Sequence, residues 1–395
     1  MAYDITVLGQ LLQLLPRTRF EAFTRQHNGD RYVKHFTCWN QLAVLLFAQL
    51  GEKKSLREIE TTMRSRDSTF YHLGITNVSR DTLAKANQNR SYKIFEDTFY
   101  ALLQQCRLFS PGSEELDIPH ELYALDATVI RVCYQLCPWA KYKKQKGAFK
   151  IHTLLSISDA LPTFLVVTPG KTADVRAAKK YPGLHTMPAG SILTMDRAYN
   201  DYRLFRDITD SECFFVVRRK KNAQTLSLES MAVSDEEKQT GILKDERIGF
   251  ILPQAVAIYP DDLRLVTYRD EKHDVVYEFL TNNFPLSAKT IADIYRHRWA
   301  IELFFKWIKQ NLVIKTFLGT SENAVQIQVW VAMIAYLLVW WVKHQTHFDG
   351  SMTTLTWMLQ DVLLEDLSLL NILRLDRESL HAAAKRCKRA QMSLL

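Results

Sequence analysis

Apolar positions recur at helical spacing over the first 118 residues. Leu8, Leu11, Leu12 and Leu15 fall on one face of a helix, and the apolar run LAVLLF at 42–47 continues the pattern. We therefore predict a helical N-terminal region over residues 1–118.

Two helix starts in this region carry capping signals. The stretch 55–58 (SLRE) has the Ser-x-x-Glu form of a capping box, and Ser79 precedes a short helix whose polar face would carry Arg80, Lys85 and Arg90. Two short helices joined through the His-Leu-Gly turn at 72–74 could form a reader of DNA similar to a helix-turn-helix. A plain helical bundle with a solvated basic face fits the same residues, so both interpretations stay open.

Short runs of strand-forming residues, separated by turn residues, begin at residue 119. They predict strands, and helical segments follow Thr172 and Asn200. Strands that first form a meander and then alternate with helices favour a mixed sheet with helices packed on it, so we predict an α/β core whose first part is 119–220. The predicted strands are 121–132, 149–158, 162–168, 191–195 and 213–217.

Residues 221–285 contain more strand candidates and no strong helical pattern. That is too much β structure for a loop, so we predict an inserted β-rich subdomain. Helical pattern resumes over 286–345, with a cap-like start at Ser287, and residues 346–395 form a C-terminal helical region. The strand candidates are 247–252, 255–259, 263–268 and 275–281, and the C-terminal region ends in the basic residues Lys385, Arg386, Lys388 and Arg389.

The most apolar run of the chain extends from Val329 to Val342. It has 14 residues, whereas a membrane span needs about 20 apolar residues. Polar Gln326 and Gln328 lie just before the run and Lys343 lies just after it. We predict a buried core helix here and no membrane partner.

Length, charge and cysteine content indicate the size of the protein, its kind of binding partner and its redox environment. The 395 residues, of which 47% are hydrophobic, suffice for several packed units. A net charge of +8 favours a polyanion such as nucleic acid. The six cysteines form no CxxC pairs and do not suggest a secreted disulfide framework, so we expect reduced thiols in a cytoplasmic protein. Cys133, Cys137 and His152 lack a fourth zinc ligand.

The segment 293–309 (DIYRHRWAIELFFKWIK) has an unusual polar stripe. On a continuous helix, Tyr295, Arg298, Glu302 and Lys309 fall within an arc of about 60°, and Lys306 is the one further polar addition to a largely apolar surface. A carboxylate on such a buried helix is costly unless it is paired or bound to a metal. Pairing of Glu302 with Arg298 or Lys306, each four residues away, is the simpler explanation.

Two further carboxylates stand where a sheet would present them. Asp126 lies inside a strand-like run, where aspartate is disfavoured, and Asp196 follows the run 192–195, at the strand end where α/β sheets usually place their sites. Either residue could also be only a cap or turn residue.

Three carboxylates brought together would repel one another and raise their pKa values, so such a cluster persists mainly by binding a cation. Oxygen ligands with open positions suit Mg²⁺ or Mn²⁺. Two such ions can activate an attacking water or hydroxyl and stabilise the departing 3′ oxygen in a displacement at phosphorus. Nearby lysines and arginines would then hold a DNA backbone.

The residues Tyr295, Arg298, Glu302 and Lys309 form the motif Tyr-x2-Arg-x3-Glu-x6-Lys. With this motif the sequence resembles the DDE transposases of bacterial insertion sequences, specifically the IS-four family. The stretches 125–155, 195–202 and 279–310 also resemble blocks of that family.

The resemblance implies a ribonuclease-H-like catalytic core, interrupted by a β-rich insertion and flanked by helical regions. The N-terminal region would recognise DNA ends, and the C-terminal region is a candidate dimer contact. The resemblance further implies that Asp126, Asp196 and Glu302 ligate two Mg²⁺ ions, with Mn²⁺ as a substitute.

The resemblance also implies contacts with DNA. Tyr295, Arg298 and Lys309 would contact phosphates near the cleaved end, and Trp299 would help to hold distorted DNA. Among the basic groups near the acids we add Lys306 and, beside Asp196, Arg197 with Tyr199.

Two other basic groups have two interpretations each. Lys141, Lys143 and Lys144 alternate with aromatic residues, which is typical of a strip that follows a nucleic-acid backbone, but a solvated loop fits equally. The same alternatives hold for Arg218 and Arg219. Lys150 and His152 share a face of one strand, and we expect His152 to be a core histidine rather than a ligand.

The activity that the resemblance implies is cut-and-paste transposition of an insertion sequence through a hairpin intermediate. Because two double-stranded ends must be handled together, we expect a homodimer with two-fold symmetry on paired terminal inverted repeats, associated with the bacterial nucleoid. The alternatives are a catalytically silent DNA-binding regulator of the same fold and a metal-dependent nuclease without strand transfer.

Overall fold

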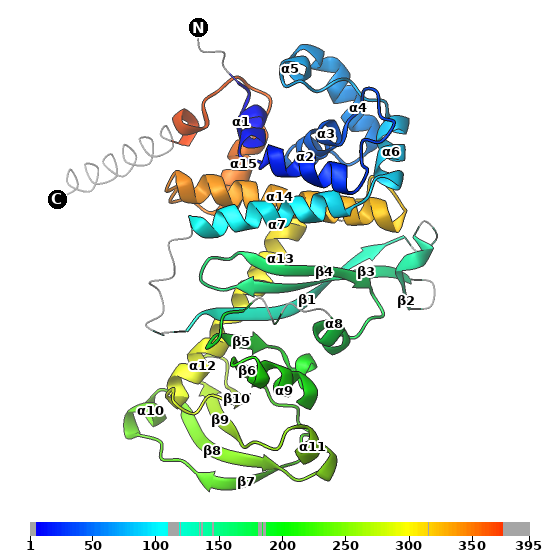
Figure 1. Cartoon of the computed structure of the whole chain (residues 1–395). Helices are drawn as coiled ribbons and strands as arrows, with labels where there is room; N and C mark the ends of the chain where they lie inside the picture. The colour runs from blue at the N-terminus through cyan, green and yellow to red at the C-terminus, as the bar shows by residue number, and fades with distance from the viewer. Residues whose placement is uncertain are drawn as a thin grey trace, which may run out of the picture. The chain divides into compact units, whose positions relative to one another are not determined.

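The structure is a computed structural model that describes residues 5–109, 118, 120–133, 135, 137–143, 146–180, 184, 187–314 and 316–373. The chain forms two compact units, residues 1–110 with 307–395 and residues 111–306 (Figure 1). The side chain of Lys143, the residue Lys144 and the C-terminal basic residues 385–389 lie outside what is described. The division into five functional regions stays a prediction.

The first unit is built from helices, as the apolar spacing predicts for the N-terminal region. Ser55 Oγ accepts from Glu58 N at 3.1 Å and Ser79 Oγ from Thr82 N at 3.2 Å, so both predicted helix starts are capped. Glu58, however, accepts from Lys54 N instead of completing the capping box. The helices are α1 (Val7–Gln13), α2 (Arg17–Gln26), α3 (Cys38–Leu50), α4 (Leu56–Ser65), α5 (Asp67–His72), α6 (Arg80–Asn89), α7 (Lys93–Leu108), α14 (Glu322–Gln345) and α15 (Met352–Val362).

Helix α14 is the central helix of this unit. It is long and apolar enough to cross a membrane by length and composition, but its most apolar window is entirely buried. It packs on α3, α6, α7 and α15, and Trp330 lies against Phe99 of α7 with 5.3 Å between the ring centroids. The predicted core helix is therefore confirmed, and it is longer than the apolar run alone.

The second unit contains one sheet of ten strands, in the order β2-β3-β1-β5-β6-β10-β9-β8-β7, with β4 also paired to β3. Strands β1, β3 and β4 are antiparallel neighbours, whereas β5 and β6 run parallel to β1. A three-stranded meander followed by two parallel strands is the ribonuclease-H-like arrangement. The predicted fold class is confirmed.

The strands of this sheet are β1 (Leu122–Val132), β2 (Lys141–Lys143), β3 (Lys146–Ser156), β4 (Pro162–Pro169), β5 (Ile192–Met195), β6 (Phe214–Arg218), β7 (Thr225–Ser230), β8 (Ile242–Phe250), β9 (Leu263–Asp270) and β10 (Val275–Thr281). The helices of the second unit are α8 (Asp174–Lys180), α9 (Tyr202–Asp210), α10 (Asp235–Gln239), α11 (Pro253–Ile258) and α12 (Ala288–His297), with short 3-10 turns at Pro138–Ala140 and Arg197–Tyr199. Helix α13 (Trp299–Asn311) begins in the second unit and ends in the first.

Helices cover both faces of the sheet (Figure 1). On one face, Leu193 and Met195 pack with Leu204 and Phe205 of α9. On the other face, Leu122, Ile192 and Val216 pack with α12. Successive strand residues alternate between these two cores.

The region 221–285 extends the sheet of the core, because β10 pairs with β6. Strands β8, β9 and β10 match predicted runs, whereas the prediction of a strand over 255–259 is wrong. Pro253 stands at the start of α11, where its missing N–H costs nothing, and the short apolar run that follows is helical. The edge strand β7 was not predicted, since its residues are nearly all exposed and lack a buried face.

The prediction of one continuous helix over 293–309 is also wrong. Helix α12 ends at His297 and α13 starts at Trp299, with Arg298 between them. Around this residue the bonds shorten to three-residue steps, from Arg298 N to Tyr295 O at 3.1 Å and from Ile301 N to Arg298 O at 3.2 Å. The break therefore falls inside the polar stripe.

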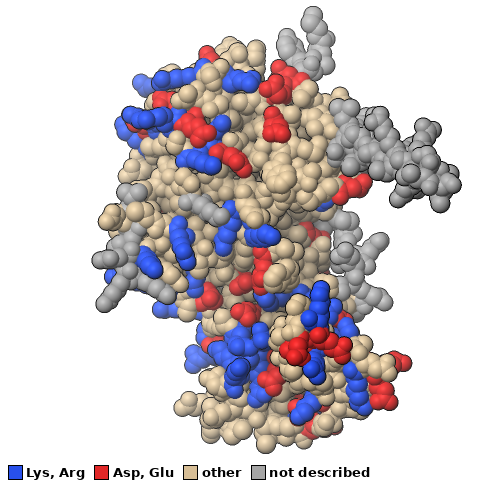
Figure 2. All heavy atoms as spheres, turned by 180° about the vertical axis from the view of Figure 1, so that it is seen from behind, with Lys and Arg blue, Asp and Glu red and all other residues tan. Residues whose placement is uncertain are grey.

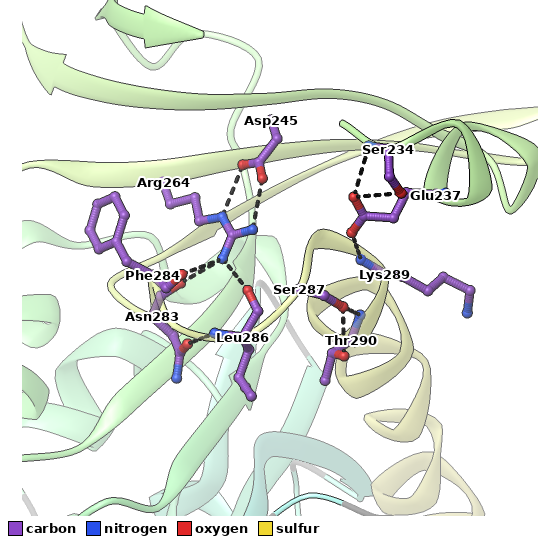
Figure 3. A network of polar contacts seen from close by, with 10 residues as sticks. All are labelled: Ser234, Glu237, Asp245, Arg264, Asn283, Phe284, Leu286, Ser287, Lys289 and Thr290. Atoms are coloured by element: carbon purple, nitrogen blue, oxygen red, sulfur yellow. Dashed lines mark hydrogen bonds and ion pairs between the residues drawn. The ribbon is translucent and has the colours of Figure 1, made fainter. Parts of the chain in front are cut away.

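A buried ion pair fixes the loop that leads into α12. Arg264 on β9 donates two hydrogen bonds to Asp245 on β8, at 2.9 and 2.7 Å, and both side chains are almost fully buried. Its remaining nitrogen, Nη1, donates to the carbonyl oxygens of Asn283, Phe284 and Leu286 (Figure 3). All three nitrogens of the guanidinium are thus bonded: two hold Asp245 on β8, and the third holds the segment between β10 and α12.

We expect Arg264→Met to lower the free energy of unfolding by about 3–5 kcal/mol, because Asp245 would keep a buried charge without a partner. The matched control is Arg269→Met on the same strand, since Arg269 forms an exposed ion pair with Asp274. The control should cost less than about 1 kcal/mol. Urea unfolding checks both values, and equal losses in the two variants would contradict the role of the buried pair.

Candidate active site

Asp126 and Asp196 lie beside each other at one end of two paired strands. β1 and β5 are parallel, and their last paired residues are Leu125 and Met195, each of which immediately precedes an aspartate. Asp126 Oδ1 accepts from Ala127 N at 2.7 Å, and Asp196 Oδ1 accepts from Arg197 N at 2.6 Å. Asp196 also caps the 3-10 turn Arg197–Tyr199, so the cap interpretation of this residue holds alongside its place in the cluster.

The alternation of side chains along the strands decides which way these two acids point. Leu122 on β1 and Ile192 on β5 belong to the core beneath α12, and the aspartates follow them by an even number of residues. Both carboxylates therefore belong to the α12 side of the sheet. This is the side on which the segment containing Glu302 begins.

Glu302 stands in the first turn of α13 and is paired with Arg298. Arg298 Nη2 donates to Glu302 Oε1 at 2.6 Å, and Nη1 lies 3.9 Å from Asp126 Oδ2. The guanidinium also lies over the ring of Tyr295, 5.5 Å from its centroid. One arginine thus joins three of the residues singled out in the sequence, despite the break in the helix.

The electrostatics of the cluster show in the pKa of Asp126. Burial raises this pKa to about 6, and the charges of Asp196 and Glu302 act in the same direction. The hydrogen bond from Ala127 N and the charge of Arg298 oppose the rise. Asp196 and Glu302 are therefore both close enough to influence Asp126, although the three acids come from three separate elements.

The donor set fits a hard divalent cation in its chemistry, because it consists of carboxylate oxygens held on two strands and a helix. Arg298 now supplies the compensating charge. Among the described residues no three histidine, cysteine, aspartate or glutamate side chains are close enough together to hold one ion. Joint ligation would require Glu302 to exchange its arginine partner for the metal.

The opposite face of the sheet carries a buried polar group behind these acids. His152 Nε2 lies 2.9 Å from Thr168 Oγ1, its pKa is lowered to about 4 by burial, and Lys150 Nζ donates to Asp174 at 2.8 Å. His152 is thus a core histidine, as expected. Tyr199 is only 1% exposed and packs in this core, so its burial does not favour the predicted contact with DNA, which stays a prediction.

The other predicted DNA-contact residues fall into distinct settings. Trp299 is 58% exposed at the start of α13, and Lys306 is exposed on the same helix, whereas Lys309 lies on its last turn. Lys141 is exposed on the edge strand β2. Arg197 immediately follows the acid Asp196.

Arg218 and Arg219 are neighbours in sequence with different surroundings. Arg218 stacks on Tyr277 at 4.7 Å from the ring centroid, and its charge acts on Tyr295. Arg219 is committed to the fold, because it bonds Glu278, Ala223 O and Thr225 Oγ1. Of these two arginines, Arg218 is therefore the one that lies near the candidate site. The bonds of Arg219 do not favour the predicted DNA contact for that residue.

Two supporting residues were not found from the sequence. Asn200 donates to Arg197 O at 3.0 Å and to Arg218 O at 2.7 Å, which fixes the turn after Asp196. Arg264 anchors the loop before α12. Arg264 could have been found from the sequence, because it is a charged residue inside the apolar strand run 263–268. The sequence has no specific signal for Asn200.

The raised pKa of Asp126 predicts a dependence of stability on pH. Because the folded-state value of about 6 exceeds the ordinary 3.8, the folded protein favours the neutral acid, and stability is lost as pH rises through about 6. Without divalent metal, Asp126→Asn should therefore raise the free energy of unfolding at pH 8, by at most about 3 kcal/mol. The gain should disappear near pH 4.

Unfolding in EDTA across this pH range measures the effect. Asp81→Asn is the control, since the Asp81 side chain is 79% exposed. If Asp126→Asn were no more stable than the unchanged protein at pH 8, burial of a costly charge at this position would be disproved.

Comparison with protein families gives two matches. Residues 117–338 match the family described as transposase DDE domain, which includes the sheet, α12, α13 and all three acids. Residues 4–76 match a domain of unknown function.

Relatives agree with the first match. The chain is 30% identical over 276 residues to a "Probable transposase for insertion sequence element IS5377" of Geobacillus stearothermophilus, with 69% of this chain and 70% of that protein covered. It is 29% identical over 257 residues to a "Putative transposase y4zB" of Sinorhizobium fredii, which covers 65% of this chain and 69% of that protein.

Among solved structures, a cryo-EM structure of a piggyBac transposase synaptic complex with hairpin DNA aligns with a TM-score of 0.45 and 10% identity. The alignment covers 93% of this chain and 79% of that chain. The family match over more than half of the chain and the curated relatives carry the assignment. Membership implies a DNA-acting enzyme of the polynucleotidyl transferase and nuclease type that uses a divalent metal, and the chain belongs to the DDE transposase family of insertion sequences.

Proposed function

We propose that this transposase carries out cut-and-paste transposition with Asp126, Asp196 and Glu302 as ligands of two Mg²⁺ ions, for which Mn²⁺ can substitute. The observation that supports the proposal most is that one electrostatic cluster joins these three acids from β1, the end of β5 and α13. When bound, such ions would activate the attacking oxygen and stabilise the departing 3′ oxygen.

Each step of the proposed reaction has the same balance. The oxygen of water or of a 3′ hydroxyl attacks phosphorus and gives up its proton, the bond from that phosphorus to a 3′ oxygen breaks, and the departing oxygen takes up a proton. Water attacks when the element end is nicked and when the hairpin is opened. The freed 3′ hydroxyl attacks when the hairpin forms and when the end joins the target. One site can therefore serve all four steps.

The basic and aromatic residues around the acids would position DNA. Arg298 would move from its carboxylate partners toward a phosphate near the cleaved end, and Tyr295 beneath it would limit the directions that the guanidinium can take. Trp299 has an exposed ring that can stack on a displaced base. Lys309, two turns further along α13 than Glu302, would contact the strand beyond the cut.

The motif Tyr295, Arg298, Glu302 and Lys309 supports placement within the IS-four group. Two ends must be cut and joined in concert, so we propose a homodimer on paired inverted repeats in the bacterial cytoplasm. Helix α15 and the chain after it are the candidate dimer contact.

We expect Glu302→Gln to abolish cleavage and strand transfer while binding of element ends stays within about twofold, because one ligand charge is lost with little change of shape. Glu322→Gln, at an exposed position in the first turn of α14, is the matched control and should keep both activities. Gel assays with Mg²⁺ on labelled end DNA measure cleavage. Preserved cutting by Glu302→Gln would reject the site.

A second experiment distinguishes the transposase from the two alternatives, a nuclease without strand transfer and a silent DNA-binding regulator. Pre-cut ends that carry a 3′ hydroxyl should be joined to target DNA by the unchanged protein. A nuclease without strand transfer would cut intact ends but yield no joined product from pre-cut ends. A silent regulator would bind the ends and give neither product.

Lys309→Ala should weaken binding of the cleaved strand by roughly three- to tenfold, on the scale expected for the loss of one phosphate contact. Titration of pre-cut ends in EDTA measures this loss separately from chemistry. A variant with unchanged affinity and unchanged joining would remove Lys309 from the site.

A further inference from the structure

A hollow of about 640 Å³ lies within the helical first unit, between the loop that follows α2 and the segment that leads into and through α6. Its lining comes from 27–36 and 76–91, outside the residues that match the DDE domain. The volume falls in the range of sites that hold a ligand of nucleotide size. On the face shown in Figure 2, lysine and arginine side chains lie over the N-terminal helices at the upper left, with aspartate and glutamate side chains among them.

The lining of this hollow is basic. It contains Arg31, Lys34, Lys85 and Arg90, together with two histidines, and no aspartate or glutamate among the described residues. Arg31, Lys34 and Lys85 are exposed, and none of them forms an ion pair in the described part of the chain. Arg90 is paired with Asp30 at 3.9 Å, whereas the three exposed cations around the concavity repel each other without such a partner, so this arrangement favours an anionic ligand.

Two acids close to the hollow, Asp97 and Asp30, already bond groups of the protein that surround it. Asp97 Oδ2 lies 2.6 Å from His27 Nε2, and Asp30 Oδ1 accepts from Cys38 N at 2.7 Å. Arg90 is nearly buried and donates to Gln41 Oε1 at 3.0 Å and to the carbonyl oxygen of Phe36. These bonds fix the loop that carries Arg31 and Lys34 against the end of α6, so the hollow is formed before any ligand arrives.

Gly29 tightens the same frame. A side chain at this position would meet Ile94 at 2.5 Å and Cys38 at 2.6 Å, so the loop lies directly on the helices beneath it. The wall at the start of α6 adds hydroxyl and amide groups from Thr76, Asn77 and Thr82. The Asn77 amide donates to Asp67 and the Thr82 hydroxyl pairs with Ser79, so these groups fix the wall, and the unpaired cations remain for an anionic ligand.

An aromatic side chain stands next to these cations. Tyr32 is 87% exposed, and the guanidinium of Arg31 lies 4.9 Å from its ring centroid. An exposed tyrosine beside unpaired lysines can contact the phosphates and sugars of a duplex, as such side chains do in protein–DNA complexes. A small inorganic anion would leave this ring and most of the hollow without contacts.

We propose that this hollow is a binding site for the phosphodiester backbone of duplex DNA, separate from the acidic cluster. The anionic ligand follows from the hollow itself, whereas its identity as DNA rests on the proposed function. Lys34 and Lys85, from the two opposite walls, are the principal phosphate contacts, and Arg31 with Tyr32 contacts the adjoining nucleotide.

The test measures binding of the full chain to a short fluorescein-labelled duplex of mixed sequence, in EDTA, from about 50 to 200 mM salt. Lys34→Ala combined with Lys85→Ala should weaken binding roughly tenfold or more near 0.1 M salt and reduce the salt dependence of log K by about 2. The matched control is Lys244→Ala with Lys272→Ala, which removes the same charge at exposed positions of the second unit. It should bind as the unchanged protein does.

Unchanged affinity and salt dependence in the Lys34 and Lys85 variant would overturn the proposal. An equal loss in the control pair would also overturn it, because the effect would then be one of net charge. A single strand of the same sequence that bound more tightly through the same lysines would reject the duplex as ligand. Far-ultraviolet circular dichroism of each variant confirms that it is folded.

The outcome is distinct from that of the catalytic proposal. Binding in EDTA does not depend on cleavage, so the experiment is repeated with Glu302→Gln, which should show the same lysine dependence. If Glu302→Gln still cut DNA, the active site would be wrong while the hollow remained supported. If cutting behaved as expected but the lysine pair had no effect, only the hollow would be rejected.

Discussion

The burial of the Asp126 carboxylate beside two further carboxylates is the constraint on which the rest of this protein depends. Asp126 has a raised pKa because burial and the charges of Asp196 and Glu302 disfavour its ionised form. A positive charge must compensate, and Arg298 does so here. The same need makes the cluster suitable for divalent metal, since the ion would supply a larger charge than the arginine it displaces.

The remainder of the second unit keeps these acids in position. The two aspartates are fixed by adjacent parallel strands, whereas Glu302 arrives on a separate segment. That segment depends on Arg264, which is buried with Asp245 and bonds the carbonyl groups of the loop before α12. Strands β8 and β9 therefore support the candidate active site without contributing a residue to it. This gives a structural reason for the β-rich region between the second aspartate and the glutamate.

The first unit has a different organisation of charge. Around the hollow, cations lie together and the neighbouring acids are used in the frame. Around the acidic cluster, anions lie together and one arginine is shared. An enzyme that must grip a polyanion and also hold metal ions at one point needs both arrangements, and it is simplest to build them on separate elements.

The sequence by itself determined the class of the fold, most strands, the buried helix α14 and the three acids, because periodicity and motif spacing are local properties. Only the tertiary structure decided that Asp126 and Asp196 share a side of the sheet while Tyr199 belongs to the opposite core, since this depends on strand register. It also decided that Arg298 breaks the helix and that 255–259 is helical, where short local patterns are ambiguous. The basic hollow joins loops and helices from 27 to 91, and no local pattern reports which of their lysines lack an acidic neighbour.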